Sequence, residues 1–271
     1  MVFEQFLESD KVKKHSLFIF ILGIFYVVVS YFVSSYFFEQ EISLAIVFTS
    51  TLLLTPSIYT ILNIEEKIES KEGLKHFFYN HKDVFKIFLF LFIGIFFAFI
   101  IIGSYSSKPL FDYQINFLKS RGDLSGSVIT DINEYIPSIS NVFGLISQNL
   151  LVIVIAFVLS VFYGAGALFL IVLNASIFAG FILYVVKEIG KAFPIISLFL
   201  IHLIPELSGF LLAAIAGGVV SRAIMKEKFG SEGFKNIMRD ALVLLLIAVG
   251  LIIISAFLEV FVSARLVKLV I

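Results

Sequence analysis

The sequence contains no cysteine, and its charged residues leave no excess of either sign. Without cysteine the chain has neither a disulfide framework nor thiolate chemistry. It carries 20 basic and 20 acidic residues, a formal net charge of zero, so the charge balance gives no indication of a nucleic-acid partner. The polar connections also lack a glycine-rich phosphate-binding loop, which argues against an ATPase.

What the chain has in excess is apolar residues. They make up 60% of its 271 residues, and the mean hydropathy is +1.06. A soluble domain cannot bury so large an apolar fraction. Runs of roughly 20 apolar residues are long enough to cross a bilayer as helices, and they lack the period-two alternation of barrel strands. The sequence therefore predicts an all-α, polytopic bundle of transmembrane helices.

We expect about seven spanning helices, with six as the alternative count. The N-terminal segment MVFEQFLESDKVKKH precedes an apolar run that no small-residue cleavage site follows, so the first helix should stay attached. We divide the chain into an N-terminal membrane region, 1–144, with three spans, and a C-terminal region, 145–271, with four. The expected spans are 17–38, 43–62, 85–103, 145–163, 166–186, 194–221 and 241–263.

The distribution of lysine and arginine predicts the orientation. Lys11–Lys14 and the connections 63–86 and 222–239 hold 13 of the 20 basic residues, which predicts a multi-pass protein of the cell membrane with a cytoplasmic N-terminus. The connection 63–86 is amphipathic and should lie along the cytoplasmic surface. Its His76 and His81 lack the spacing that puts two ligands on one helical face, so we predict no metal site there.

The second long connection, about residues 104–144, is punctuated by serine, glycine, lysine and aspartate. The same charge bias places it on the external side of the membrane. It is a natural place for an external partner, although a short amphipathic piece resting on the membrane interface fits equally well.

Three ionisable residues stand inside otherwise apolar runs: His202, Glu206 and Glu259. Such side chains are costly in hydrocarbon and are kept where they have a partner or a task. His202 and Glu206 are four residues apart and share a helical face, and a contact with Glu259 is geometrically feasible. An amide such as Asn174 could complete the cluster. The trio fits a structural clasp, a proton or ion site, or a metal site.

Pro205 lies between His202 and Glu206 in the apolar run. Proline removes a backbone donor and clashes with the carbonyl four residues earlier, so we expect a kink or a break in this helix. The sequence GFLLAAIAGG after Glu206 offers a surface of small residues for close helix packing. Its glycines are Gly209, Gly217 and Gly218.

Four motifs then occur in order: ISQNLLVIVIAF, VFYGAGALFLIVLNASIFAG, HLIPELSGFLLAAIAGG and ISAFLEVFV. In this ordered set the chain resembles the stage II sporulation protein M family, including its archaeal membrane branch, over about residues 145–263. The family usually has Pro-His-Gly before its glutamate, whereas Ile201 and Leu203 flank the histidine here. The positions that match the family pattern are Asn149, Gly164, Gly166, Asn174, Gly180, His202, Glu206 and Glu259.

The resemblance implies a membrane scaffold or assembly component without catalytic activity, metal or cofactor of its own. Its expected partners are the lipid bilayer, further copies of the chain or other membrane and envelope proteins, and no nucleic acid. Two alternatives stay open at this point. One is a proton- or ion-coupled transporter or channel that uses His202, Glu206 and Glu259, and the other is an intramembrane metal-dependent hydrolase.

Overall fold

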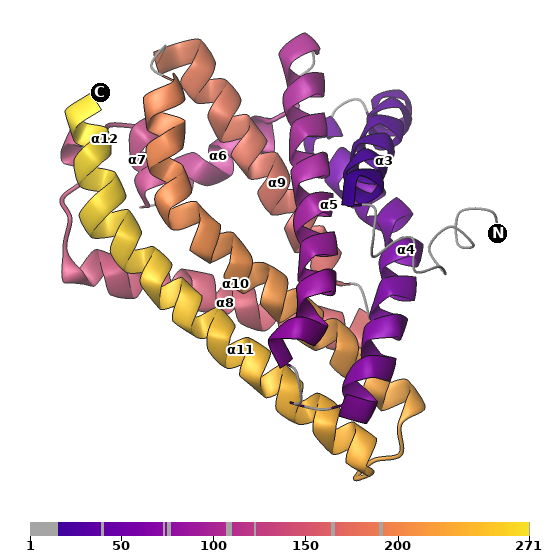
Figure 1. Cartoon of the computed structure of the whole chain (residues 1–271). Coiled ribbons are helices and arrows are strands. Elements are labelled where there is room, and N and C mark those ends of the chain that lie inside the picture. The colour runs from indigo at the N-terminus through magenta and orange to yellow at the C-terminus, as the bar shows by residue number, and fades with distance from the viewer. Residues whose placement is uncertain are drawn as a thin grey trace.

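The chain folds into a bundle of helices, and within the residues that the structure describes there is no strand. The computed structural model describes residues 16–38, 41–72, 74, 77–106, 110–121, 123–163, 166–189 and 192–270. The all-α prediction is confirmed (Figure 1). The α-helices are α3 (Ser16–Phe37), α4 (Ile42–Glu72), α5 (Phe77–Tyr105), α6 (Asp112–Ser120), α7 (Leu124–Ile129), α8 (Ile139–Tyr163), α9 (Ala167–Tyr184), α10 (Ala192–Lys226), α11 (Glu232–Leu258) and α12 (Ala264–Val270).

Three shorter segments interrupt or extend these helices. A 3₁₀ turn, η1 (Ile132–Glu134), follows α7, and π-helical segments η2 (Val185–Ile189) and η3 (Glu259–Ser263) continue α9 and α11. Seven helices in the described ranges are long and apolar enough to cross a membrane, as the sequence predicted. They are α3, α4, α5, α8, α9 with η2, α10, and α11 with η3 and α12.

The structure differs from the sequence prediction in the connection 63–86. Residues 63–72 continue α4 without a break, and α5 begins at Phe77, so these residues form no separate piece on the membrane surface. The helix continues because its inner face stays buried: Leu62, Glu65 and Glu69 follow one another at helical spacing, and each is at most 1% exposed. The buried carboxyl groups of Glu65 and Glu69 lie next to polar side chains of other helices.

The connection 104–144 also packs into the protein. Helix α6, helix α7 and η1 bury Leu118, Leu124, Ile129 and Ile132 in a hydrophobic cluster with side chains of α9, α10 and α12. This segment lies at the end of the bundle where α12 ends, whereas the α4–α5 and α10–α11 ends meet at the opposite end (Figure 1). The external connection of the sequence analysis is therefore part of the folded core.

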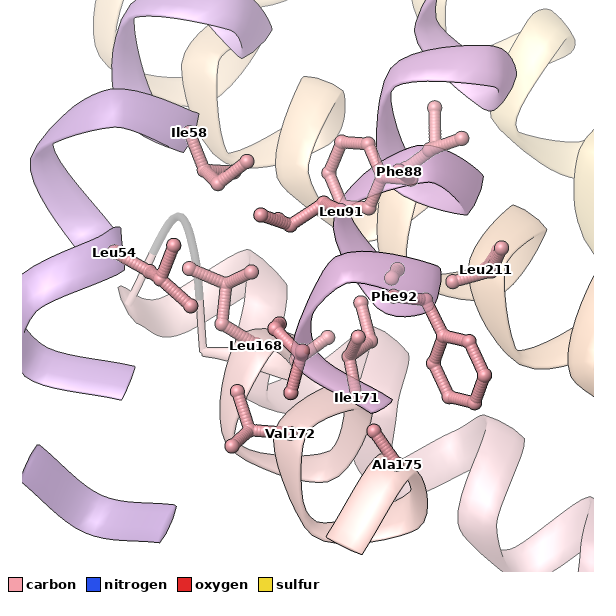
Figure 2. Close-up of a cluster of buried hydrophobic side chains, with 14 of the residues drawn as sticks. Leu54, Ile58, Phe88, Leu91, Phe92, Leu168, Ile171, Val172, Ala175 and Leu211 are labelled. Atoms are coloured by element: carbon pink, nitrogen blue, oxygen red, sulfur yellow. The ribbon is translucent and has the colours of Figure 1, made fainter. Parts of the chain in front are cut away.

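The main hydrophobic core joins the N-terminal and C-terminal regions. Side chains from α4 and α5, such as Leu54 and Leu91, interdigitate with side chains from α9 and α10, such as Leu168 and Leu211 (Figure 2). All four are at most 1% exposed. Since this core cannot be assembled from either region alone, the first helices are needed to bury the apolar faces of the later ones.

Helix α10 runs through Pro205 without interruption, so the expected break is absent, and the expected kink stays a prediction. Glycines allow close approach on both sides of this helix. A Cβ at Gly217 would lie 2.6 Å from the backbone oxygen of Phe157 on α8, and one at Gly209 would lie 3.0 Å from that of Ala248 on α11. Gly218 is buried beside Gly217, and Gly164 lies outside the described residues.

Two glycines of the resemblance also mark tight contacts. A Cβ at Gly166 would collide with the backbone of Leu159, and one at Gly180 would lie 2.9 Å from the ring of Phe111. The latter contact lets the segment leading into α6 sit directly on α9. Gly180 thereby helps to hold the α6–α7 segment against the bundle.

Gln114 connects three helices through one buried amide. Its carbonyl oxygen accepts a 2.5 Å hydrogen bond from Ser43 of α4, and its Nε2 donates a 3.0 Å bond to Ser176 of α9. We expect Gln114→Leu to lower the free energy of unfolding by about 1–3 kcal/mol, because both buried hydroxyl groups lose a partner. Chemical unfolding in detergent measures the change. Exposed Asn133→Leu is the control, and equal stability of the two variants would contradict the prediction.

Candidate functional site

The structure brings His202, Glu206 and Glu259 together at the end of the bundle that holds α6 and α7. His202 and Glu206 lie one turn apart on α10, and Glu259 is the first residue of the π-helical segment η3. One ligand atom of each side chain lies within 4.8 Å of the other two. His202 and Glu259 are buried, with 3% and 4% of their surface exposed, while Glu206 is partly buried.

The hydrogen bonds of His202 define which ring nitrogen faces the carboxylates. Ser263 donates its hydroxyl proton to the carbonyl of Leu198 at 3.0 Å, so its oxygen is left to accept from Nδ1 of His202 at 2.9 Å. In a neutral imidazole Nε2 then carries the lone pair. This atom faces Oε2 of Glu259 at 3.8 Å. The lone pair therefore points to where a proton or a metal ion would sit between the two side chains.

Glu259 holds the α6–α7 segment as well as facing His202. Its Oε1 accepts a 2.9 Å hydrogen bond from the backbone amide of Leu124, the first residue of α7. A π-helical segment begins at Glu259, and such local departures from α-helix are frequent at functional sites. Ser255, one turn earlier, donates a 2.8 Å bond to the carbonyl of His202, which fixes α11 against α10 at this level.

The sequence analysis missed two charged residues of the site, Arg121 and Asp123. They form an ion pair just before α7, and Asp123 caps α7 by accepting from the amide of Gly126 at 2.9 Å. Both line the same cavity as the predicted trio. Their positions in a polar connection gave no signal, because only the packing of α6 and α7 into the bundle brings them near Glu206 and Glu259.

The two predicted amides have different places. Asn149 is buried on α8, close enough for a side-chain hydrogen bond with Glu206, and its own carbonyl oxygen has no partner among the described residues. Asn174 of α9 lines the cavity beside His202 and Glu206. The site thus draws on α8, α9, α10, η3 and the α6–α7 segment.

These side chains surround a polar cavity of about 30 Å³. A cavity that holds one water molecule needs roughly 10–15 Å³, so this cavity has room for one or two waters or a small cation. Its polar lining is Arg121, Asp123, Ser125, Asn174, His202, Glu206 and Glu259. We call this set the upper site.

Tyr135 borders the upper site from outside the spanning helices. Its burial, together with the charge of nearby Glu259, raises the pKa of Tyr135 to about 12. The phenol therefore keeps its proton at neutral pH. The side chain of Asn141 acts against this rise, and Tyr135 is only 5% exposed.

Ser263 supports the upper site by fixing the imidazole of His202. We expect Ser263→Ala to lower the free energy of unfolding by about 1–2 kcal/mol, because the Nδ1–H of His202 and the carbonyl of Leu198 both lose a partner. Ser197→Ala is the matched control, because Ser197 is an exposed serine that also donates to a backbone carbonyl. Thermal unfolding of both variants measures the difference, and equal midpoints would contradict it.

Chemically, the upper site can hold a proton or a cation. It offers a nitrogen lone pair and two carboxylates, a donor set compatible with a metal ion or with proton exchange in a small hydrated volume. It can also act as a clasp, since its hydrogen bonds connect α7, α10 and α11.

The comparison with known families extends over more of the chain than the four motifs. A family model described as Stage II sporulation protein M matches residues 87–264, which confirms the resemblance. The match begins within α5, so it includes the α6–α7 segment and every residue that lines the upper site. Neither the curated proteins nor the solved structures contain a match to the chain.

Proposed function

The chain belongs to the stage II sporulation protein M family, and from this premise we propose that it is a multi-pass membrane protein that binds a cation at the upper site in ion-coupled transport. The observation that supports this proposal is the polar cavity. His202, Glu206 and Glu259 converge on it, and it has room for an ion or water.

Transport needs a site that can hold and release its ion. The arrangement favours binding and release of an ion, because the lone pair of His202 Nε2 and the carboxyl group of Glu206 both face the cavity. Among the described residues, no lysine forms an ion pair with either side chain. Arg121 is engaged with Asp123. A cation entering the cavity would therefore meet carboxyl oxygens and the nitrogen lone pair of His202.

The proposed orientation places the upper site toward the outside of the cell. The adjoining ends of α4, α5, α10 and α11, with their connections, carry most of the described basic residues, and these helix ends meet at one end of the bundle (Figure 1). With that end in the cytoplasm, the N-terminus is cytoplasmic as well, because seven crossings alternate.

The decisive experiment is a flux measurement in liposomes that contain only the purified protein. Proton flux and the fluxes of Na⁺, Ca²⁺ and Mn²⁺ are followed with indicators inside the vesicles. We expect flux of one of these ions, and at least a tenfold loss in Glu206→Gln. Glu232→Gln, with its side chain 80% exposed, is the matched control and should retain the flux. Absence of flux for all four ions would end the transport proposal.

A membrane scaffold is the second candidate, in line with what the family resemblance implies. The observation that favours it is the bond between Glu259 and the amide of Leu124, which holds the α6–α7 segment on α11. In this proposal the upper site is a clasp that shapes a surface for further copies of the chain or for other membrane and envelope proteins. Neither proposal gives the chain a catalytic activity of its own.

The two candidates differ in how a cation affects stability. If the upper site is an ion site, a bound cation raises the thermal midpoint of the native protein, and Glu206→Gln reduces that shift with little loss of stability in the absence of the cation. If the site is a clasp, the same substitution lowers the midpoint without any cation. The proposed scaffold would then be tested by crosslinking in native membranes, where loss of partner adducts in Glu259→Ala is the expected result.

A further inference from the structure

A second polar cluster lies at the opposite end of the bundle. Glu65 and Glu69 stand one turn apart near the end of α4, His81 lies in the second turn of α5, and Asp240 lies on α11. All four side chains are buried: the residues are 0–4% exposed. We call this set the lower site.

The lower site contains buried polar atoms that the protein leaves without hydrogen bonds. Glu69 is completely buried, and neither of its carboxylate oxygens accepts a hydrogen bond in the described part of the chain. The same holds for Nε2 of His81 and Oδ1 of Asp240. Leaving charged groups buried in this way costs several kcal/mol unless a partner of opposite charge is present.

The basic side chains nearby are directed elsewhere. Lys226 forms a 3.1 Å ion pair with Glu66, which lies on α4 beside the lower site. The guanidinium group of Arg222 sits 3.0 Å from the centre of the Tyr59 ring. Among the described residues the ion pairs of the lower site involve His81 alone, so three carboxyl groups share one imidazole.

The distances within the lower site match those between ligands of one metal ion. Nδ1 of His81 is hydrogen-bonded to Oε1 of Glu65 at 3.0 Å and lies 3.4 Å from Oε1 of Glu69. Ligands about 2.1 Å from a metal lie about 3.0 Å apart at right angles and about 3.4 Å apart at tetrahedral angles. One ligand atom from each of the three side chains lies within 4.8 Å of the others. We propose that Glu65, Glu69 and His81 bind a divalent transition-metal ion.

Asp240 occupies the position of a supporting group. If Nδ1 of His81 binds the metal, Nε2 carries the proton, and it faces Oδ2 of Asp240 at 3.8 Å. A carboxylate behind a metal-binding histidine fixes the ring and raises its basicity. Asp240 is therefore a positioning residue that connects α11 to a site built by α4 and α5.

The donor set narrows the class of metal. Two carboxylates and one imidazole suit Mn²⁺, Fe²⁺ or Zn²⁺, whereas Ca²⁺ and Mg²⁺ prefer oxygen ligands alone. The site lies close to one end of the bundle, because Glu69 and His81 lie three and four residues from the ends of their helices. At 1.5 Å per residue these positions are only about 5–6 Å deep.

This site could not be predicted from the sequence, because its ligands come from two helices that the sequence analysis treated as one surface segment. There His81 was compared with His76, which lies outside the described residues. The relevant spacing was Glu65 to Glu69, four residues apart on one helical face. The partner His81 faces them only because α4 and α5 form an antiparallel pair.

The test is metal binding by the purified full-length chain. After removal of metals with a chelator, Mn²⁺ is titrated and its free concentration is followed by electron paramagnetic resonance, and Zn²⁺ is counted by mass spectrometry. We expect one ion per chain at the lower site. Glu69→Gln and His81→Asn should weaken binding at least about 100-fold, and Asp240→Asn about 10-fold.

Two controls keep the result specific. Glu66→Gln removes a neighbouring acid of α4 that pairs with Lys226, and it should leave metal affinity unchanged. Glu206→Gln separates this site from the upper site, so the lower-site proposal stands or fails independently of the transport proposal. Glu69→Gln removes a buried carboxyl group that accepts no hydrogen bond, so without metal it should be as stable as the native chain or more so, and a folded variant is available for the titration.

Two outcomes would overturn the proposal. One is a folded native chain that binds less than one Mn²⁺ or Zn²⁺ per molecule at micromolar concentrations. The other is binding that survives both Glu69→Gln and His81→Asn in a chain that also carries Glu206→Gln.

Discussion

Gly217→Val is expected to reduce the free energy of unfolding by about 3 kcal/mol, because the new side chain has no space between α10 and α8. A Cβ at this position would lie 2.6 Å from the backbone oxygen of Phe157 and 2.7 Å from Cβ of Ser160. A backbone atom cannot yield as the end of a side chain can. The two helices must therefore separate, and the interface of small residues that joins them loses its contacts.

Two glycines provide matched controls for this prediction. A Cβ at Gly144 of α8 or at Gly250 of α11 would meet no atom within 4 Å. Valine at these positions tests the intrinsic helix effect of the same substitution, which is below about 1 kcal/mol and favours valine, because glycine is the poorer helix former. Unfolding in mixed detergent micelles measures all three variants. A loss at Gly217 no larger than at Gly250 would show that close helix approach does not control stability here.

Glu259→Ala is expected to release the α6–α7 segment and to destabilise the protein by about 3 kcal/mol. The substitution removes the acceptor of the buried Leu124 amide and leaves a hole beside His202. Glu259→Gln keeps an oxygen for Leu124 and should cost less. Hydrogen exchange measures the effect locally: the amide of Leu124 should lose protection by at least tenfold in the alanine variant and keep most of it in the glutamine variant.

Glu188→Ala is the control for this substitution, since Glu188 is also a glutamate in a π-helical segment but is exposed. It should leave exchange at Leu124 unchanged. Equal protection of Leu124 in the native chain and in Glu259→Ala would contradict the clasp and would favour a role for Glu259 confined to the cavity.

The sequence was sufficient for the fold class and for the trio of the upper site. Apolar runs of spanning length report the membrane environment directly, and an ionisable residue inside such a run stands out against it. His202, Glu206 and Glu259 were found for this reason. The number of spanning helices could also be predicted, because each span is a separate apolar run in the sequence.

The remaining residues of the two candidate sites could not be recognised because their environment is created by tertiary packing. Arg121 and Asp123 lie in a polar connection, and Glu65 and Glu69 lie in a charged one, where acids and bases are ordinary. Only the burial of these connections among the helices makes their charges unusual. Composition alone cannot distinguish a solvated loop from a polar segment that packs among the helices.

The shared core of α4, α5, α9 and α10 has a consequence for how the protein is made. Asp240 leaves the ribosome 171 residues after Glu69, the difference of their positions, which at cellular rates of synthesis takes roughly 10–30 s. During that interval the acidic end of α4 can meet His81 but not α11. Biogenesis of the protein therefore includes a stage before α11 is inserted. During this stage Glu65 and Glu69 must stay solvated at the membrane surface.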